Sequence, residues 1–278
     1  MKRVKHLILN WFDDRGIEVN RKEKVAFLGH TYFLSKGAFL RANEKDDGWL
    51  YSLGRHKKNI LDIGCNIGQS TLLLLLGTNN RIICVDPNPK ALSRCAENLI
   101  YNNLGPQANF INAFVSDKVG ESIQFYSSLT DAAGSMFSTF AKTSSSIGKS
   151  TWVNQVTVDA ICQSNNFVPD LIKIDVEGAE HLVLKGISTV LEKAKPFIFV
   201  EMHSGTGLSI VDNTNLVMEW CKDNKYEPYY LKNHAKLHTT ETVKHRGRYH
   251  LLLLPEGEPY PEYLNQIPEN FNLSQVKS

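Results

Sequence analysis

An acid and two glycines at fixed spacing stand out between two apolar runs. Ile60-Leu61 leads into Asp62-Ile63-Gly64-Cys65-Asn66-Ile67-Gly68, and the apolar run Leu72–Leu76 follows. This order predicts a buried strand, a tight glycine turn, and a helix whose N-terminus faces the turn. Glycine at 64 and 68 lets the backbone approach a ligand where a Cβ would clash. The alternative is a purely structural glycine turn in some other α/β protein.

The acid at the start of the turn indicates which ligand the turn would take. A dinucleotide-binding Gly-x-Gly-x-x-Gly turn would need glycine at 66 and 69, but Asn66 and Gln69 stand there. A carboxylate suits an ammonium group rather than a pyrophosphate. S-adenosylmethionine carries an ammonium, a carboxylate and a sulfonium, and no phosphate. The motif therefore predicts S-adenosylmethionine as the cofactor, held by Asp62, Gly64, Cys65, Asn66 and Gly68.

Two later strand ends extend this predicted cofactor site. The apolar run Arg81–Val85 ends in Asp86, which follows Gly64 by 22 residues. At about this spacing, α/β nucleotide folds place the carboxylate that accepts hydrogen bonds from ribose hydroxyls. Asn88 is expected to cap the next helix and to lie beside the cofactor. A third strand is predicted over 109–115, where Asn112 or Phe114 would contact the adenine; the alternative makes Phe114 a core residue only.

A second polar stretch supplies candidates for proton transfer. Leu171–Ile174 predicts a buried strand that ends in Asp175 and turns through Glu177-Gly178, and the strand over 196–200 ends in Glu201-Met202-His203. The candidate general bases are Asp175, Glu177 and His203, and Asp175 is also assigned to the cofactor site. His203 would need the least tuning, because an unperturbed imidazole has a pKa of about 6.5.

Structural alternatives stay open for all three candidate bases. Asp175 would then cap a turn, Glu177 would cap the following helix, and His203 would be a strand-end histidine held by a hydrogen bond. A metal-assisted variant is also open, because Asp175 and Glu201 end neighbouring predicted strands with His203 close by. Oxygen-rich sites suit Mg²⁺, which would bind a substrate hydroxyl and lower its pKa.

Alternating strands and helices are expected to position these residues. The alternation predicts an α/β fold in which helices cover both faces of a parallel sheet and the strand ends form one rim. We expect a single helix through Val183, Ile187 and Leu191, and the later elements lie over 213–224, 226–231 and 250–254. The expected parts are an N-terminal extension or cap over 1–57, a catalytic domain over 58–256 and a C-terminal tail over 257–278.

Two further segments give weaker indications. Short strands are expected over 24–28 and 31–34 within the N-terminal extension. Residues 127–151 are rich in Ser, Thr, Gly and Ala. They are expected to form a mobile loop, which is either a substrate lid or an ordinary surface loop.

Composition limits the partners and the compartment. The chain has 278 residues, 31 basic and 29 acidic, so its net charge of +2 implies no polyelectrolyte partner and no nucleic acid. Five cysteines without a C-x-x-C pair favour a reducing compartment and no zinc site, and Cys65, Cys84 and Cys95 are expected to be small core residues. The start Met1–Leu9 has a basic head, and the apolar run that follows it stops at Asn10, which is too short for the core of a signal peptide. No apolar run approaches the roughly 20 residues that span a bilayer. These features predict a cytoplasmic protein.

Together the motifs resemble the FkbM family of S-adenosylmethionine-dependent methyltransferases. The resemblance covers roughly residues 58–204. It rests on five stretches: Asp62–Gly68, Val85–Pro89, Val158–Ile161, Ile172–Glu180 and Glu201–His203. The family mostly has Glu where Asp86 stands, and either acid can serve the ribose. The resemblance implies a class I (Rossmann-like) methyltransferase fold with a seven-stranded, mostly parallel sheet whose last strand is antiparallel. It also implies O-methylation of a hydroxyl on a sugar, glycan or secondary metabolite.

Two rival functions and one further cluster remain open. A methyltransferase acting on the nitrogens of nucleic-acid bases would resemble its class in an Asn/Asp-Pro-Pro-aromatic turn, where this chain has Asp175-Val176-Glu177-Gly178. The other rival is a cofactor-binding scaffold that has lost catalysis. A basic cluster between the last two strands would bind a phosphate of the acceptor or form a solvated loop. Its members are Lys232, His234, Lys236, His238, Lys244, His245, Arg246 and Arg248.

Overall fold

The computed structural model describes residues 22–28, 30–36, 38, 46–127, 134–135, 149–205 and 207–273. The expectations for Met1–Leu9 and for most of 127–151 lie outside these residues. Among the described helices, none is both long and apolar enough to cross a lipid bilayer.

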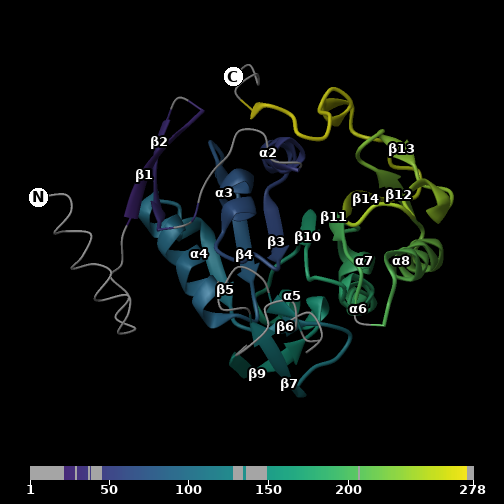
Figure 1. The fold of residues 1–278 in the computed structure, drawn as a ribbon, viewed down its shortest axis with the longest axis horizontal. Helices are drawn as coiled ribbons and strands as arrows, with labels where there is room; N and C mark the ends of the chain where they lie inside the picture. Colours follow the sequence, from purple (N-terminus) through teal and green to yellow (C-terminus); the bar gives the residue numbers. More distant parts are fainter. Residues whose placement is uncertain are drawn as a thin grey trace, which may run out of the picture.

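A mixed sheet in the order β13-β12-β14-β11-β10-β3-β4-β5 forms the core (Figure 1). Five neighbouring strands run parallel, namely β3 (Asn59–Ile63), β4 (Arg81–Val85), β5 (Ala108–Ile111), β10 (Leu171–Ile174) and β11 (Phe197–Met202). β14 (Tyr249–Pro255) is antiparallel and lies between β11 and β12 (Tyr226–Tyr230). The predicted mostly parallel sheet with an antiparallel last strand is confirmed. The two-residue β13 (Ala235–Lys236) adds an eighth strand at the edge.

Helices cover both faces of this sheet, as the alternation predicts. One hydrophobic cluster joins sheet residues such as Ile60 and Ile82 to α2 (Asp47–His56), α3 (Gln69–Leu75) and α4 (Pro89–Tyr101). A second cluster joins their strand neighbours Leu61 and Ile83 to the other four helices. These are α5 (Val158–Ser164), α6 (Glu180–Lys185), α7 (Thr189–Lys193) and α8 (Ile210–Asn224). Successive strand residues face opposite layers, which is why the central strands are mostly apolar and their few charged residues, such as Asp62 and Lys173, are paired with each other.

The predicted third strand is split in two. β5 ends at Ile111, and β6 (Phe114–Val115) pairs instead with β9 (Lys149–Val156). The side-chain amide of Asn112 donates to the carbonyls of Asp86 and Pro87, which fixes the chain at the end of β4 and turns it out of the sheet. A second sheet follows, in the order β6-β9-β7-β8, with β7 (Ser122–Ser127) and β8 (Gly134–Ser135).

The predicted single helix after residue 180 is also split. α6 ends before Gly186, where an added Cβ would lie 2.4 Å from the carbonyl oxygen of Ser116. α7 then begins anew, because the carboxylate of Asp159 accepts the backbone N–H groups of Ser188, Thr189 and Val190. Asp159, which belongs to one of the family-like motifs, therefore stabilises a helix start.

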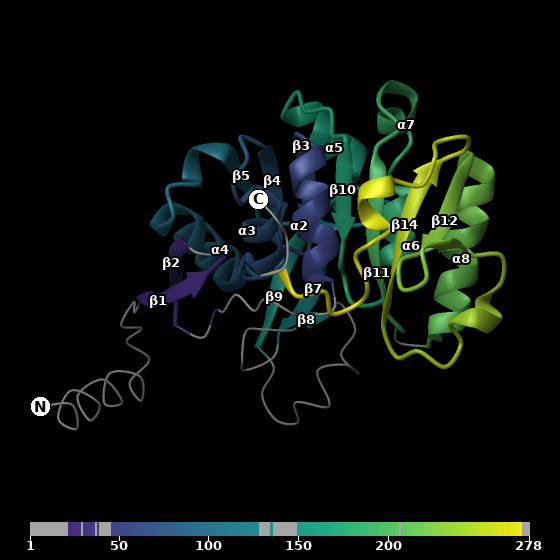
Figure 2. The same ribbon diagram turned by 90° about the horizontal axis from the view of Figure 1, so that it is seen from above.

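The two flanks pack against the same core as the sheet. β1 (Lys22–Phe27) and β2 (His30–Ser35), where two short strands are expected, form an antiparallel hairpin (Figures 1 and 2). The backbone N–H of Ser35 donates to the side-chain oxygen of the buried Asn98 of α4. At the other end, Trp49 Nε1 donates to the carbonyl of Ile267, and Leu273 is fully buried in the α2 layer. The division into extension, domain and tail stays a prediction.

Candidate active site

The glycine turn is held in a backbone conformation that only glycine adopts easily. Gly64 has φ +77° and Gly68 has φ +85°. A Cβ on Gly64 would lie 1.8 Å from the carbonyl oxygen of Asp175, so the turn after β3 is in direct contact with the turn after β10. Gly64 N–H donates to the carbonyl of Val85, which adds the end of β4 to the same junction. The three strand ends therefore form one rigid rim.

Asp62 lies beneath this rim rather than on its surface. Its carboxylate is 0% exposed, accepts a hydrogen bond from the Thr71 hydroxyl at 2.6 Å, and lies 3.2 Å from Lys173 Nζ. Lys173 is 3% exposed, donates to the carbonyl of Gly64 and lies 3.5 Å from Asp175. Burial lowers the pKa of Lys173, but the carboxylates of Asp62 and Asp175 outweigh burial and raise the pKa above its ordinary value. The ammonium therefore stays charged. The geometry thus gives Asp62 a cation from within the protein.

Asp86 faces the open side of the rim. Its two carboxylate oxygens accept the backbone N–H groups of Asn66 and Asn88, both at 2.8 Å. Burial raises its pKa to about 6, although these two hydrogen bonds favour the charged form. Asn88 in turn caps α4, since its side chain accepts from the N–H groups of Lys90 and Ala91. The predicted cap is confirmed.

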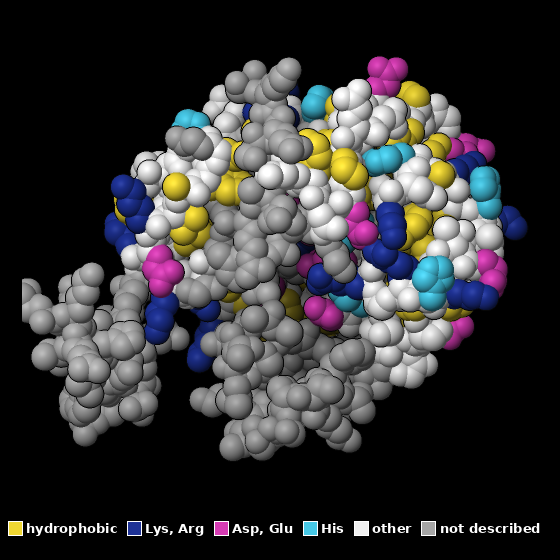
Figure 3. Space-filling view, turned by 45° about the horizontal axis from the view of Figure 1, so that its top comes forward, with side chains coloured by type: hydrophobic (Ala, Val, Ile, Leu, Met, Phe, Trp, Pro, Cys, Tyr) yellow, Lys and Arg dark blue, Asp and Glu magenta, His cyan; other side chains and the backbone are white. Residues whose placement is uncertain are grey.

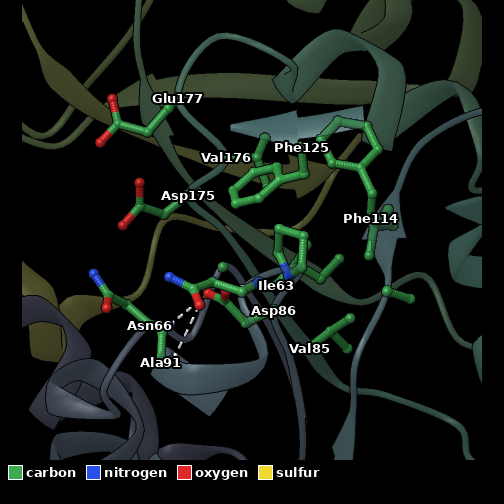
Figure 4. A pocket seen from close by; sticks show the side chains of 15 residues that line it. Ile63, Asn66, Val85, Asp86, Ala91, Phe114, Phe125, Asp175, Val176 and Glu177 are labelled. Carbon is green, nitrogen blue, oxygen red and sulfur yellow. Dashed lines mark hydrogen bonds between the residues drawn. The ribbon is translucent and has the colours of Figure 1, made fainter. Parts of the chain in front are cut away.

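A pocket with about 620 Å³ of empty space opens between the two sheets. Figure 4 shows the carboxylates of Asp175 and Glu177 on one side and the rings of Phe114 and Phe125 on the other. Six predicted cofactor residues line it, namely Gly64, Asn66, Asp86, Asn88, Phe114 and Asp175. Four others lie outside this lining, namely Asp62, Cys65, Gly68 and Asn112. A flat aromatic side and a ribose-binding carboxylate are what a nucleoside requires.

The turn after β10 presents two carboxylates to this pocket. Asp175 is partly exposed, and burial raises its pKa to about 7, although Lys173 opposes the shift. Glu177 has φ +53°, a strained conformation for a residue with a side chain, and its carboxylate is 43% exposed. α6 begins only at Glu180 with Ala179 as its N-terminal cap, so Glu177 is not the helix cap.

His203 is surrounded by carboxylates. Its Nδ1 lies 3.0 Å from Glu180, and its Nε2 lies 3.5 Å from Glu201 and 3.8 Å from Glu177. Burial lowers the pKa of His203, but the hydrogen bonds to Glu180 and Glu201 outweigh it and raise the pKa to about 11. An imidazolium cannot accept a proton. The structure therefore does not support the premise that His203 is the base that needs the least tuning.

The buried Glu180 is hydrogen-bonded to His203. The carboxylate has no exposed surface, accepts from Asn213 Nδ2 at 2.6 Å and from the Gly178 N–H at 3.0 Å, and faces His203. Asn213 also donates to the carbonyl of His203. These contacts connect α6, α8 and the end of β11, and fix the orientation of the ring.

Two groups of potential metal ligands assemble at this rim. Asp175, Glu177 and His203 place ligand atoms within 4.8 Å of one another, and Asp46, Glu201 and His250 do the same. The predicted set of Asp175, Glu201 and His203 is thus divided between two groups. Glu201 also lies 2.8 Å from Arg248 Nε. Burial raises the pKa of the Glu201 carboxyl, but the hydrogen bonds to His203 and His250 outweigh burial and lower that pKa.

The basic cluster is largely paired within the protein. Lys236 contacts Glu227, Lys244 contacts Glu241, and Arg246 contacts Glu269. Arg248 is the member that reaches the candidate active site, where it contacts Glu201 and stays 49% exposed. On this face, acidic and basic side chains lie side by side in a hollow (Figure 3). The pattern resembles a mixed-charge surface more closely than a phosphate site.

Sequence reasoning gave no role in this site to Lys173, Glu180 or Phe125, and it placed Arg248 in the basic cluster rather than beside Glu201. A signal existed for Lys173, because a lysine inside the apolar strand run Leu171–Ile174 is unusual without a buried partner. Glu180 stands in the most specific motif, but its partners are 23 and 33 residues away. Phe125 and Arg248 carry no local signal.

The strand order places this molecule in the class I methyltransferase fold. Seven strands of the main sheet match it, with the antiparallel β14 between β11 and β12 and the candidate site at the C-terminal strand ends. A family model described as the methyltransferase FkbM domain matches residues 62–228. The chain belongs to the FkbM family of S-adenosylmethionine-dependent methyltransferases.

Several known proteins are similar to the chain. The 2-O-methyltransferase NoeI of Sinorhizobium fredii is 30% identical over 157 residues, covering 51% of this chain and 62% of NoeI. The hexuronic acid methyltransferase AglP of Haloferax volcanii is 26% identical over 175 residues, covering 61% of this chain and 68% of AglP. The solved structure of an FkbM methyltransferase from Methylobacillus flagellatus is 17% identical, with a TM-score of 0.46, covering 70% of this chain and 43% of that one. The match thus spans less than two thirds of NoeI.

Proposed function

We propose that this protein transfers a methyl group from S-adenosylmethionine to a hydroxyl of a sugar or glycan. The observation that carries the proposal is the Asp175 carboxylate, which lines the pocket and whose pKa burial raises to about 7. NoeI is a 2-O-methyltransferase and AglP is a hexuronic acid methyltransferase, and these activities support a sugar acceptor for this chain. A secondary metabolite with a similar hydroxyl is the other acceptor class that the family resemblance allows.

The pocket fits the cofactor on its own chemistry. Asp86 uses each carboxylate oxygen for one backbone N–H, which leaves further lone pairs for ribose hydroxyls. Phe114 and Phe125 offer flat apolar surface for adenine. The half-buried Asn66 lines the same pocket. When bound, S-adenosylmethionine supplies a methyl group on a sulfonium.

Asp175 would act as the general base. An alcohol is a poor nucleophile at neutral pH, so its proton must leave as the new bond forms, and such help is typically worth about 10²–10⁴-fold. Asp175 Oδ takes this proton, and a pKa of about 7 keeps much of the carboxylate ionised at neutral pH. Lys173 and the imidazolium of His203, 3.5 Å and 4.0 Å from Asp175, hold the carboxylate in place.

Glu177 and His203 would orient the acceptor. On the turn after β10, Glu177 is more exposed than Asp175, and it would accept hydrogen bonds from sugar hydroxyls next to the reacting one. His203 has both ring nitrogens directed at carboxylates, so we assign it to positioning rather than to proton transfer. Orientation of this kind contributes at least as much to the rate as the base.

A Mg²⁺ ion at Asp175, Glu201 and His203 remains the second mechanism. Both imidazole nitrogens of His203 contact carboxylates, whereas a histidine that binds a metal ion needs a free lone pair on one nitrogen. This contact pattern argues against the metal mechanism. We therefore propose a metal-free base. The rate in the presence of EDTA should equal the rate without it; loss of activity that Mg²⁺ restores would establish the metal mechanism instead.

The test combines cofactor binding with methyl transfer. Calorimetric titration with S-adenosylhomocysteine should give micromolar binding, and labelled S-adenosylmethionine should then label some member of a panel of glycosides and hexuronates. Asp175→Asn should abolish labelling and keep cofactor binding, whereas the exposed Asp117→Asn serves as the matched control. Binding without labelling of any acceptor would favour the inactive scaffold, and labelling of a nucleic acid would favour the other rival.

A further inference from the structure

Three cysteine side chains that have no part in this mechanism meet beneath the glycine turn. Cys65 lies in the turn, Cys84 on β4 and Cys95 on α4, and each is at most 1% exposed. Their three Sγ atoms lie within 4.8 Å of one another, and all three thiols are free. They are 19 and 11 residues apart in the chain. The fold, rather than a sequence motif, brings them together.

The spacing of the three sulfur atoms suits one central atom. An ion bonded to three sulfurs at about 2.3 Å places those sulfurs about 4 Å apart. The observed separations therefore require only small side-chain shifts. A disulfide would draw two sulfurs to about 2.05 Å and leave the third without a partner.

The surroundings are suited to a soft ion. Cys65 Sγ lies 3.8 Å from the carbonyl of Asn66, Cys95 Sγ lies 3.8 Å from the hydroxyl of Thr71, and the thiols hydrogen-bond one another. The three cysteines belong to an apolar cluster that also includes Leu72 and Ala91, and the nearby carboxylate of Asp62 is held by Thr71 and Lys173. Thiolate sulfur selects thiophilic ions over oxygen-seeking ones such as Mg²⁺.

The cysteine cluster adjoins the cofactor pocket. Gly64 and Asn66, the neighbours of Cys65 in the chain, both line that pocket. Cys65 is thus the member of the cluster that lies nearest to the pocket along the chain.

We propose that Cys65, Cys84 and Cys95 form a three-sulfur site for a soft, thiophilic metal ion. Binding forms three metal–sulfur bonds, and the thiol protons that the metal displaces pass to solvent. No atom changes its oxidation state, so the step needs no oxidant or reductant.

The site is coupled to the cofactor pocket through the elements that it joins. The turn, β4 and α4 also carry Asn66, Asp86 and Asn88. A Cβ on Gly68 would lie 2.7 Å from Cys95 Sγ, so the turn rests directly on this thiol. Drawing the sulfurs together should therefore weaken cofactor binding, and cofactor should weaken metal binding by the same factor. This coupling rests on the proposed function, whereas the metal site itself does not.

Cadmium titration of the reduced, full-length protein tests the site. Cd²⁺ bound to thiolates gives a sulfur-to-metal charge-transfer band in the ultraviolet, and native mass spectrometry gives the stoichiometry. The variant Cys162→Ala/Cys221→Ala removes the other two cysteines and is the matched control. It and the wild type should each bind one Cd²⁺ with the same band. In that background, Cys65→Ser, Cys84→Ser and Cys95→Ser should each weaken binding at least tenfold.

Absence of the band in the control variant, or an unchanged band in any folded serine variant, would overturn the proposal. A second measurement needs no serine variant. Bound Cd²⁺ should slow the alkylation of Cys65, Cys84 and Cys95 in the wild type relative to the metal-free protein, as read by peptide mass mapping over time, and leave the alkylation rates of the buried Cys162 and Cys221 unchanged. Protection of neither group, or of the wrong one, would also overturn it. Failure of the metal-free protein to bind S-adenosylhomocysteine would instead count against the proposed function alone.

Discussion

His203 Nδ1 lies 3.0 Å from Glu180 Oε1, and that carboxylate has no exposed surface. Glu180→Gln keeps the shape of the side chain but leaves the imidazolium without its nearest buried counter-charge. Breaking a buried pair in this way should lower the free energy of unfolding by about 3 kcal/mol. Urea unfolding measures the change, and the exposed Glu192→Gln should change it by less than about 0.5 kcal/mol. Equal stability of the two variants would show that the buried pair is not a net contributor.

The same histidine should make stability depend on alkaline pH. Its pKa rises to about 11 in the folded protein, from an ordinary value of about 6.5. The stabilisation is complete below the lower value and is lost as the pH rises through the higher one. Four carboxylates face the ring, namely Asp175, Glu177, Glu180 and Glu201. Between about pH 7 and pH 10 the free energy of unfolding should fall more steeply in wild type than in His203→Gln; parallel slopes would contradict the assignment.

The raised pKa of Asp175 should appear in the pH–rate profile. The carboxyl must be ionised to accept a proton, so kcat/KM should rise with pH, reach half its plateau near pH 7, and stay level above it. Asp175→Asn should lower kcat/KM at least about 100-fold and leave the Kd for S-adenosylhomocysteine within about threefold. A half-plateau near pH 4 would instead mean that Asp175 titrates as an ordinary surface acid.

The two aspartates of the cofactor motifs should separate into different phenotypes. Asp86→Asn should weaken S-adenosylhomocysteine binding at least about tenfold, because Asp86 lines the pocket, and should cost only about 1 kcal/mol of stability, because one backbone N–H loses its acceptor. Asp62→Asn should cost about 3 kcal/mol of stability, because it leaves Lys173 without its closest buried carboxylate. Calorimetry and thermal melts on both variants decide the matter. Lost binding at full stability in Asp62→Asn would restore the sequence-based role of an ammonium ligand.

Gly64→Ala should prevent the chain from folding. The new Cβ would lie 1.8 Å from the carbonyl oxygen of Asp175, and both atoms belong to the rim backbone. Gly247→Ala is the matched control, because nothing lies within 4 Å of its added Cβ. Soluble expression and a melting curve suffice as the readout. A folded Gly64→Ala variant would show that the two turns can separate.

Much of the site could be predicted because its residues end strands. A run of apolar residues followed by an acid or glycine is local information, and it correctly placed Gly64, Asn66, Asp86 and Asp175 at one rim. The role of Asp62 could not be predicted, because Lys173 comes from a neighbouring strand more than 100 residues later. The sequence around Asp62 alone does not show that Lys173 is its partner.

The failures share this non-local origin. His203 looked suited to proton transfer at its ordinary pKa, but Glu180 and Glu201 reach it from other elements and hold it charged. The strand over 109–115 looked continuous because five of its seven residues are apolar. Asn112 divides it by bonding to the carbonyls that follow β4, a partnership that no periodicity reveals.

The strands of the second sheet are inserted in the sequence between β5 and α5, and the strand order of the main sheet is unchanged by them. Through Phe114 and Phe125 it nonetheless supplies one wall of the pocket. Such an insertion is a natural graft point. A relative could carry a different second sheet, and therefore a differently shaped pocket, without any change in the pairing of the central strands. Chimeras cut at Ile111 and Val158 offer a direct way to transplant acceptor choice between members of the family.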